Sequence, residues 1–271
     1  MINEINNKPY DFLSYLKRVR KYRFLLVSLS KRELKVKYSR TILGLGWVFV
    51  QPLVAVIVYT MFFRNFIKLD TNQIPYVQFV FSGVVFWYIF TGILAKGSNS
   101  LLESTELINK VSFPRIILVV AKSFPVIIEG FVLYLVLLGI VIFNNDVSFS
   151  GVVLSLFYLL QIIIFSSSLA VILSVMVVWA RDILHVIPFA IGFGIWLTPV
   201  FYPVSIIPAQ YQNYVRYLNP VANAIEGLRD TLFMGKPIGL DSLIIFFGSL
   251  VLLLIALIFF IKFERKIVGR I

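Results

Sequence analysis

Long apolar stretches separated by short polar segments dominate this chain of 271 residues. An α-helix rises about 1.5 Å per residue, so roughly 20 apolar residues are needed to cross about 30 Å of hydrocarbon. The stretches of this kind lie at about residues 44–63, 76–95, 115–143, 151–179, 183–201 and 240–261. The pattern therefore predicts an all-α polytopic membrane protein with six transmembrane helices.

The segment before the first stretch has apolar residues at three- and four-residue steps, with basic residues between them. This amphipathic pattern predicts a helix over residues 10–37 that lies in the membrane interface. It is typical both of a simple surface anchor and of a gate at the cytoplasmic mouth, and periodicity does not distinguish the two. The apolar residues that share the spacing are Leu16, Val19, Tyr22, Leu26 and Leu29.

Two regions depart from plain transmembrane helices. The fifth stretch contains Pro188, Gly192, Gly194 and Pro199, so it is expected to be broken or re-entrant, which is tolerated where protein shields the backbone. The polar segment after the second stretch, at residues 96–114, is helix-prone and falls on the cytoplasmic side by alternation.

The longest outer segment, residues 202–239, contains two short helical patterns. They are Ala209–Leu218 and Pro220–Met234. Asn219 is placed to cap the second helix, a proline fills its first turn, and Gly235 follows its last residue. We therefore expect two helices at the outer membrane surface.

Composition agrees with a membrane protein, because 59% of the residues are hydrophobic and only 14% are charged. A soluble domain carries about 25% charged residues. The chain has no cysteine, which excludes disulfides, cysteine metal sites and thiol catalysis, and no metal site is expected. The polar, basic start is too long for a cleavable signal peptide.

Basic residues are unevenly distributed in a chain whose formal net charge is +12. Residues 1–43 hold 11 of the 25 Lys and Arg, and a second basic run follows the last apolar stretch. Because Lys and Arg gather on cytoplasmic loops, both termini are predicted to lie in the cytoplasm. Charge at one membrane face serves orientation and contact with membrane lipids, so we exclude nucleic acid as a partner.

Two ionisable residues, Lys122 and Glu129, fall within the third apolar stretch. They lie two turns apart on one helix face, about 10 Å along the axis, and are too distant to pair directly. Charged residues at membrane depth suggest function. A proton relay is one interpretation, and an interhelical hydrogen bond is the other and the favoured one.

Four motifs in order along the chain resemble those of the membrane subunits of ABC-2 type polysaccharide exporters. The first is RELKVKYSRTILGLGWVFVQPLVAVIVYTMFF at Arg32–Phe63, where a charged Leu-Lys-x-Lys-Tyr run precedes Leu-Gly-x-x-Trp and a proline within the first span. The others are LINKVSFPRIIL, ARDILHVIP and WLTPVFYPVSIIP, at Leu107–Leu118, Ala180–Pro188 and Trp196–Pro208. With six spans at matching positions, the resemblance covers nearly the whole chain.

The resemblance implies a homodimer of six-span subunits docked on two cytoplasmic ATPase subunits that bind ATP and Mg. Such a complex lies in the inner membrane of a bacterium and moves a polyprenyl-pyrophosphate-linked glycan outward. Residues 1–43 would form a cytoplasmic region with a gate helix, and residues 44–271 the six-span domain. That domain would contain a coupling helix at about 96–113 and outer gate helices at about 203–235.

Spans one and five resemble the pore-lining elements of this family, so their aromatic residues are candidates for the substrate path. Flat apolar faces stack on sugar rings without requiring one register, which suits a sliding polymer. Packing is an equally good explanation for any single one of them. The candidates are Trp47, Tyr59, Trp196, Phe201 and Tyr202. We assign Tyr76 and Tyr158, near span ends, to interfacial aromatic belts instead.

A basic cluster before the first span is a candidate site for the pyrophosphate headgroup, since Arg offers forked donors and Lys point charges. The alternative is plain contact with anionic lipid. The members of the cluster are Lys31, Arg32, Lys35, Lys37 and Arg40.

The helix-prone inner loop is the candidate for docking an ATPase. Its polar residues suit ion pairs and hydrogen bonds in a cleft, although a solvated loop helix would have the same pattern. The residues in question are Glu103, Glu106, Asn109 and Lys110.

No nucleotide-binding motif is found. Lys236 follows Gly235, but a proline comes next and no glycine lies five residues before Gly235, so this is not a phosphate-binding loop. We therefore expect a transport subunit without enzymatic activity. The alternatives are an ABC-2 exporter of drugs or lipids, an ion-coupled carrier using Glu129 and Lys122, and an integral membrane glycosyltransferase. O-antigen, teichoic acid and capsule remain open as cargo.

Overall fold

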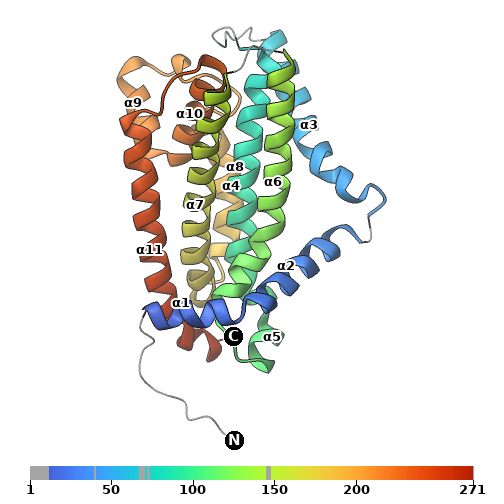
Figure 1. Cartoon of the computed structure of the whole chain (residues 1–271), viewed down its shortest axis with the longest axis vertical. Coiled ribbons are helices and arrows are strands. Elements are labelled where there is room, and N and C mark those ends of the chain that lie inside the picture. The colour runs from blue at the N-terminus through green and yellow to red at the C-terminus, as the bar shows by residue number, and fades with distance from the viewer. Residues whose placement is uncertain (1–11, 40, 67–70, 72–73, 145–147, 271) are drawn as a thin grey trace, which may run out of the picture.

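The computed structural model describes residues 12–39, 41–66, 71, 74–144 and 148–270. Within these residues the chain is a bundle of long helices without β-strands (Figure 1). The elements in order are α1 (Phe12–Lys21), α2 (Arg23–Tyr38), η1 (Gly44–Gly46), α3 (Trp47–Tyr59), η2 (Thr60–Phe66), α4 (Tyr76–Glu103), α5 (Thr105–Lys110), α6 (Ile116–Asn144), α7 (Phe149–Trp179), α8 (Ile183–Leu197), η3 (Val204–Ile206), α9 (Ala209–Leu218), α10 (Pro220–Met234) and α11 (Leu240–Val268).

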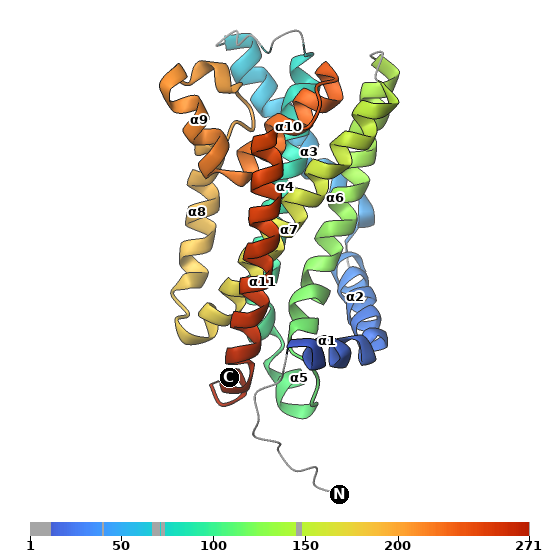
Figure 2. The ribbon, with the colours of Figure 1, turned by 60° about the vertical axis from the view of Figure 1, so that its left-hand side comes forward.

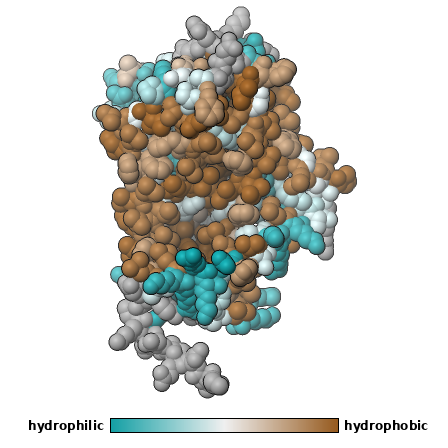
Figure 3. Space-filling model, in the orientation of Figure 1, coloured by the Kyte–Doolittle hydropathy of each residue, from teal (hydrophilic) through white to brown (hydrophobic). Residues whose placement is uncertain are grey.

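The long helices alternate in direction, so the polar connections gather at two ends (Figures 1 and 2). The end that carries α1, α5 and the C-terminal end of α11 is called the inner end. The opposite end, which carries α9, is called the outer end. Hydrophobic side chains cover the surface between the two ends, whereas hydrophilic ones gather at the inner end (Figure 3). This distribution matches a protein that spans a membrane.

Five helical segments of the described residues are long and apolar enough to cross a membrane. They are Gly44–Arg64, Tyr76–Glu103, Ile116–Asn144, Phe149–Trp179 and Leu240–Ile267, and they confirm five of the six predicted spans as helices of sufficient length. The first of these closes on the π-helical η2.

The fifth predicted span is the short helix α8, whose 15 residues extend about 22 Å. We expected the stretch at residues 183–201 to be broken or re-entrant. Helix α8 runs through Pro188, Gly192 and Gly194 without a break, and the stretch is interrupted only near its end, before Pro199. The chain leaves the helix only at Thr198, which is extended with φ −112° and ψ 133°. Thr198 precedes Pro199, and a residue before proline disfavours helical backbone.

The predicted interfacial helix over residues 10–37 is two helices, α1 and α2, separated at Tyr22. The Tyr22 hydroxyl donates a hydrogen bond to the Ser112 carbonyl, at 3.2 Å, from the loop before α6. The break allows α1 to cross the inner end against α11 while α2 packs along α6 (Figure 1). A tertiary contact thus divides a segment whose local pattern is continuous.

Helix α4 forms the centre of the bundle and packs against α3, α6, α7, α8 and α10. The belt assignment of Tyr76 and Tyr158 is wrong, because their side chains are only 4% and 2% exposed. Tyr76 donates to the Phe201 carbonyl at 2.8 Å, and the Tyr158 hydroxyl donates to the Ser242 hydroxyl at 3.1 Å. Both tyrosines find their partners inside the bundle because other elements cover the ends of their helices.

The helices predicted in the outer segment are confirmed with their boundaries. Asn219 accepts from the N–H groups of Val221 and Ala222 at 3.1 and 3.2 Å, and so caps α10. Gly235 ends the helix in the left-handed conformation, with φ +62°, where glycine avoids a steric cost. Only α9 lies on the surface, whereas α10 is largely buried against α7 and α4.

Candidate functional site at the inner end

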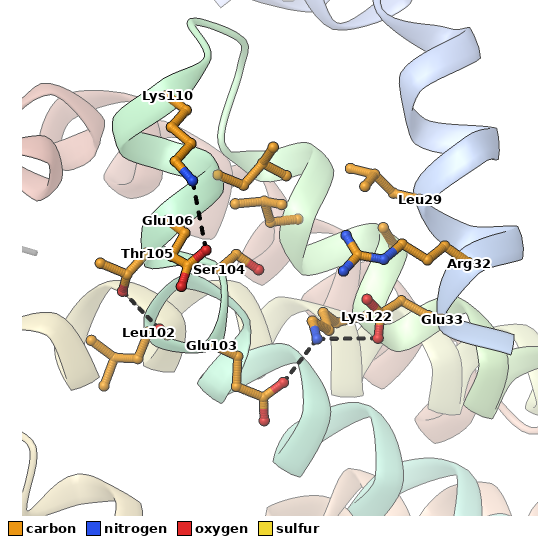
Figure 4. A pocket seen from close by; sticks show the side chains of 13 residues that line it. Leu29, Arg32, Glu33, Leu102, Glu103, Ser104, Thr105, Glu106, Lys110 and Lys122 are labelled. Carbon is orange, nitrogen blue, oxygen red and sulfur yellow. Dashed lines mark hydrogen bonds and ion pairs between the residues drawn. The ribbon is translucent and has the colours of Figure 1, made fainter. Parts of the chain in front are cut away.

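A cleft of about 540 Å³ opens at the inner end between α2, the α4–α5 junction and the first turns of α6. Figure 4 shows its charged walls, with Arg32 and Glu33 from α2 facing Glu103, Glu106 and neighbouring residues across the opening. The cleft adjoins the loop expected to dock an ATPase, so it is the candidate functional site.

Lys122 of α6 lies at the base of this cleft and is 17% exposed. Its ammonium nitrogen is 3.1 Å from a Glu33 carboxylate oxygen on α2 and 3.0 Å from a Glu103 carboxylate oxygen on α4 (Figure 4). One cation therefore joins three helices, with one of its two acids on each of the other two helices.

The four docking candidates lie on two helices, with Glu103 on α4 and Glu106, Asn109 and Lys110 on α5. The predicted coupling helix at 96–113 is instead the last turns of α4 followed by α5, which contains only six residues. Glu103 ends α4 and is engaged by Lys122 and by the Asn99 amide at 2.7 Å. Because α4 continues to Glu103, this acid points toward the bundle.

The remaining docking candidates stay available at the surface. Glu106 and Lys110 form an i,i+4 pair at 3.8 Å on α5, with side chains 92% and 76% exposed, and Asn109 is exposed beside them. An exposed pair at this distance contributes little to stability. Its groups are free to exchange their contact for one with another protein.

Glu129 is buried two turns further along α6, at 2% exposure. The Lys37 ammonium donates to both of its oxygens, at 2.8 and 2.7 Å, and the hydroxyls of Tyr38 and Tyr88 donate one hydrogen bond each. This arrangement agrees with the favoured interpretation, an interhelical hydrogen bond. Burial and then the bond to Glu129 raise the pKa of Tyr38, so this hydroxyl stays a donor at neutral pH.

The basic cluster is divided by these contacts. Lys31, Arg32 and Lys35 are exposed on α2, whereas Lys37 is committed to Glu129. Arg40 lies outside the described residues. Three bases of the cluster are thus exposed, with Arg32 at the wall of the cleft, and the fourth, Lys37, holds α2 to α6.

Trp47 lies apart from the other aromatic candidates. It borders a cavity of about 300 Å³ at the junction of α2 and α3, together with Thr41, Gln51 and the Glu129 partners Lys37 and Tyr38. The cavity thus combines an indole face with an amine, hydroxyls and an amide.

The four other aromatic candidates come together at the outer end. The Phe201 ring centroid is 4.7 Å from that of Tyr59, 5.0 Å from Trp196 and 5.4 Å from Tyr202. Phe201 is 1% exposed, so in this arrangement it packs the cluster and does not line a path. Trp196 is 57% exposed, and Tyr202 is half-buried with its hydroxyl bonded to the Trp196 carbonyl at 2.8 Å.

Sequence reasoning missed Arg229. Its side chain is 2% exposed and donates to the carbonyls of Pro199 and Val200, at 2.7 Å each, and of Phe79, at 2.9 Å. It also pairs with Glu226 at 2.6 Å. Arg229 therefore fixes the turn after α8 against α4. The capping signal at Asn219 placed Arg229 on a helix, but no local pattern indicates that this side of α10 is buried.

A second missed group is Glu264 near the end of α11, which is 4% exposed. Its carboxylate accepts from the Arg115 backbone N–H at 2.6 Å, directly before the first residue of α6, where a negative charge is favourable. Burial and then the nearby Glu264 raise the pKa of Tyr15 on α1. Glu264 thus gathers α1, α6 and α11 at the inner end.

Comparison with known proteins gives one family and several relatives. The family model described as "ABC-2 type transporter" matches residues 25–233. An O-antigen export system permease protein RfbA of Klebsiella pneumoniae is 26% identical over 251 residues, which is 89% of this chain and 93% of the relative. The protein of the same name from Myxococcus xanthus is 29% identical, over 74% of this chain and 77% of its own length.

A more distant relative is the polysialic acid transport protein KpsM of Escherichia coli. It is 22% identical over 212 residues, which cover 77% of this chain and 81% of the relative.

Proposed function

The chain belongs to the ABC-2 type transporter family, and from this premise we propose that it is the membrane-spanning permease subunit of an ATP-driven polysaccharide exporter. The observation that carries the proposal is the near full-length similarity to permeases named for O-antigen export. The cargo is a polymer on a polyprenyl-pyrophosphate carrier, moved outward across the inner membrane of a bacterium.

The proposed complex takes its energy from separate ATPase subunits, two for each pair of permeases, which bind ATP and Mg. Support comes from the inner end, where α5 presents the exposed Glu106, Asn109 and Lys110 beside a cleft of about 540 Å³. An exposed helix beside an open cleft offers a partner protein polar side chains to contact and a concave surface into which it can insert its own residues.

We infer that the permease acts with a second copy of itself. In the first span, Gly44–Arg64, which contains α3, only 17% of the most apolar part is buried within the chain. Helix α8 exposes Phe189, Phe193 and Trp196. At the outer end, Tyr59 of α3 stacks on Phe201 in the turn after α8, and Trp196 of α8 packs against the same ring. Exposed apolar side chains on both helices suit either lipid or another copy, and a path for a polymer requires walls on both sides.

The exposed bases Lys31, Arg32 and Lys35 on α2 are the proposed contact for the pyrophosphate, and Lys37 serves to hold the helix. Orientation follows the charge, so that the inner end and both termini face the cytoplasm. The cavity beside Trp47 is lined by Lys37 and Tyr38 at the end of α2 and by Trp47, Val48 and Gln51 of α3, so it lies where the α2 helix leads into the first span.

The proposal is tested by expressing the chain with ABC ATPase subunits of the same organism and purifying the complex through a tag on the permease. Co-purification and ATP-dependent movement of a lipid-linked glycan into vesicles are expected. Glu106→Gln with Lys110→Gln should lower co-purification, whereas Lys236→Gln, at an outer-end pair with Asp230, should leave it unchanged. A permease that binds no ATPase in these conditions contradicts the proposal.

A further inference from the structure

The ion pairs at the inner end form a regular arrangement along two helices. On α6, Lys122 and Glu129 are seven residues apart, about two turns, so they project from one face. On α2, Glu33 and Lys37 are four residues apart, about one turn, and face them with the opposite order of charge. The two pairs of opposite polarity fix how α2 lies along α6, since any shift would bring like charges together.

The two pairs differ in strength. Glu129 is buried and takes four hydrogen bonds from three side chains, so the pair at this position resists opening. Glu33 and Glu103 are 23% and 35% exposed where they contact Lys122, and water screens their attraction. The pair nearer the cleft is therefore the one that a partner can open and close.

Lys122 contacts two acids, Glu33 on α2 and Glu103 on α4, and Glu103 lies next to the docking helix α5. Glu103 is the last residue of α4, and the Ser104 carbonyl that follows accepts from the N–H groups of Leu107 and Ile108 in α5, at 3.0 Å each. One residue thus separates the Lys122 contact from the exposed helix α5. A displacement of α5 moves Glu103, and Lys122 passes that displacement to Glu33 on α2.

We propose that Lys122 is a positioning residue that transmits movement of the docking segment to α2 through its pairs with Glu103 and Glu33. The inference rests on the proposed function, because it gives the ATPase stroke a route from α5 to the helix that presents Lys31, Arg32 and Lys35. Glu129 acts as the fixed point, and the Lys122 pairs act as the movable link. No contact between Lys122 and the substrate or nucleotide is involved.

A serial link makes a specific prediction about combined variants. Glu33→Gln and Glu103→Gln each cut one arm, so each alone should equal Lys122→Met, and the double variant should be no worse. The expected loss is about five- to tenfold in glycan moved per ATP hydrolysed, in the range of coupling between sites. Lys122→Arg keeps the charge and should restore at least half of the wild-type ratio.

The control is Lys96→Met, which removes an exposed lysine of α4 that forms no ion pair with any described residue. It should leave the ratio unchanged. Additive losses from the two arms, or a Lys122→Met ratio equal to that of Lys96→Met, would overturn the inference. A wild-type complex that moves no glycan with ATP would instead contradict the proposed function.

A second measurement on the full chain alone, in nanodiscs, tests the link without an ATPase. Because the sequence has no cysteine, spin labels attach only at introduced sites, here Lys35→Cys on α2 and Asn109→Cys on α5. The distance distribution between the labels should broaden in Lys122→Met and stay narrow in Lys122→Arg. The same distribution with and without Lys122 would refute the linkage, whatever the cargo is.

Discussion

Replacing Arg229 by methionine tests how the outer end of the bundle is held. The guanidinium donates to the Pro199 and Val200 carbonyls of the turn after α8 and to the Phe79 carbonyl of α4. It also pairs with Glu226 and lies 3.5 Å from the Phe79 ring centroid. Methionine has a similar length, so Arg229→Met removes these bonds without leaving a large void.

The magnitude follows from which groups lose their partner. Phe79 lies inside α4 and keeps its helical hydrogen bond, whereas the Pro199 and Val200 carbonyls lose theirs, at about 1–3 kcal/mol each. Breaking a buried ion pair costs about 3–5 kcal/mol. Burial already raises the pKa of Glu226, so this acid would take up a proton and limit the cost. With Glu226 neutral, the two unpaired carbonyls set the loss, which we expect to be about 2–6 kcal/mol.

The assay is thermal unfolding of the purified chain, with hydrogen exchange followed over residues 198–206. Arg229→Met should lower the midpoint by on the order of 10 °C and speed exchange in the turn. The matched control is Lys236→Met, whose pair with Asp230 is 54% exposed on the lysine side and is worth about 0–1 kcal/mol. Equal stability of the two variants would refute the assigned role of Arg229.

Three further changes probe other parts of the structure. Gly83→Ala would place a Cβ 2.2 Å from the Val200 carbonyl oxygen, so it should cost about 1–3 kcal/mol and speed exchange in the same turn; unchanged exchange would contradict this packing. Glu129→Leu leaves two tyrosine hydroxyls and a lysine without their acceptor, so in a Lys35→Cys background it should speed labelling of the introduced cysteine on α2. Glu129→Gln, which still accepts, should speed it less, and equal labelling would argue against the hydrogen-bond network. Phe201→Ala should lower stability by about 3–5 kcal/mol, and the exposed Trp196→Ala by less than about 1 kcal/mol while slowing export; the reverse order would show that their burial is misassigned.

The sequence predicted those features whose signals are local. The boundaries of α9 and α10 followed from Asn219, Pro220 and Gly235, which act through backbone conformation and capping within a few residues. The long spans followed from apolar length alone. These elements need no knowledge of the rest of the fold.

Other features depend on tertiary contacts that no local pattern records. The break at Tyr22 arises where α1 meets α11 while α2 follows α6, and Tyr22 bonds Ser112, 90 residues away. The engagement of Glu103 by Lys122 required knowing that α4 continues past the predicted end of its span. To predict that Arg229 is buried, one would have to know that α10 packs inside the bundle. The sequence of α10 also suits a surface helix.

Glu129 illustrates a middle case. Its depth in an apolar stretch indicated a partner, and the candidate lysine on its own helix was too far away. The actual partner, Lys37, comes from the basic cluster that the sequence suggested as a site for the pyrophosphate headgroup or for anionic lipid. A sequence pattern can therefore require a partner for a buried acid without identifying which of several bases supplies it.

The most direct test of the whole account uses proteoliposomes that contain the purified chain, with and without its ATPase, and a fluorescent lipid-linked glycan. We predict that glycan crosses the bilayer only when the ATPase and ATP are both present, and that an ion gradient alone moves none. Uphill movement by this chain alone, driven by an ion gradient, would contradict the claim that it depends on a separate motor.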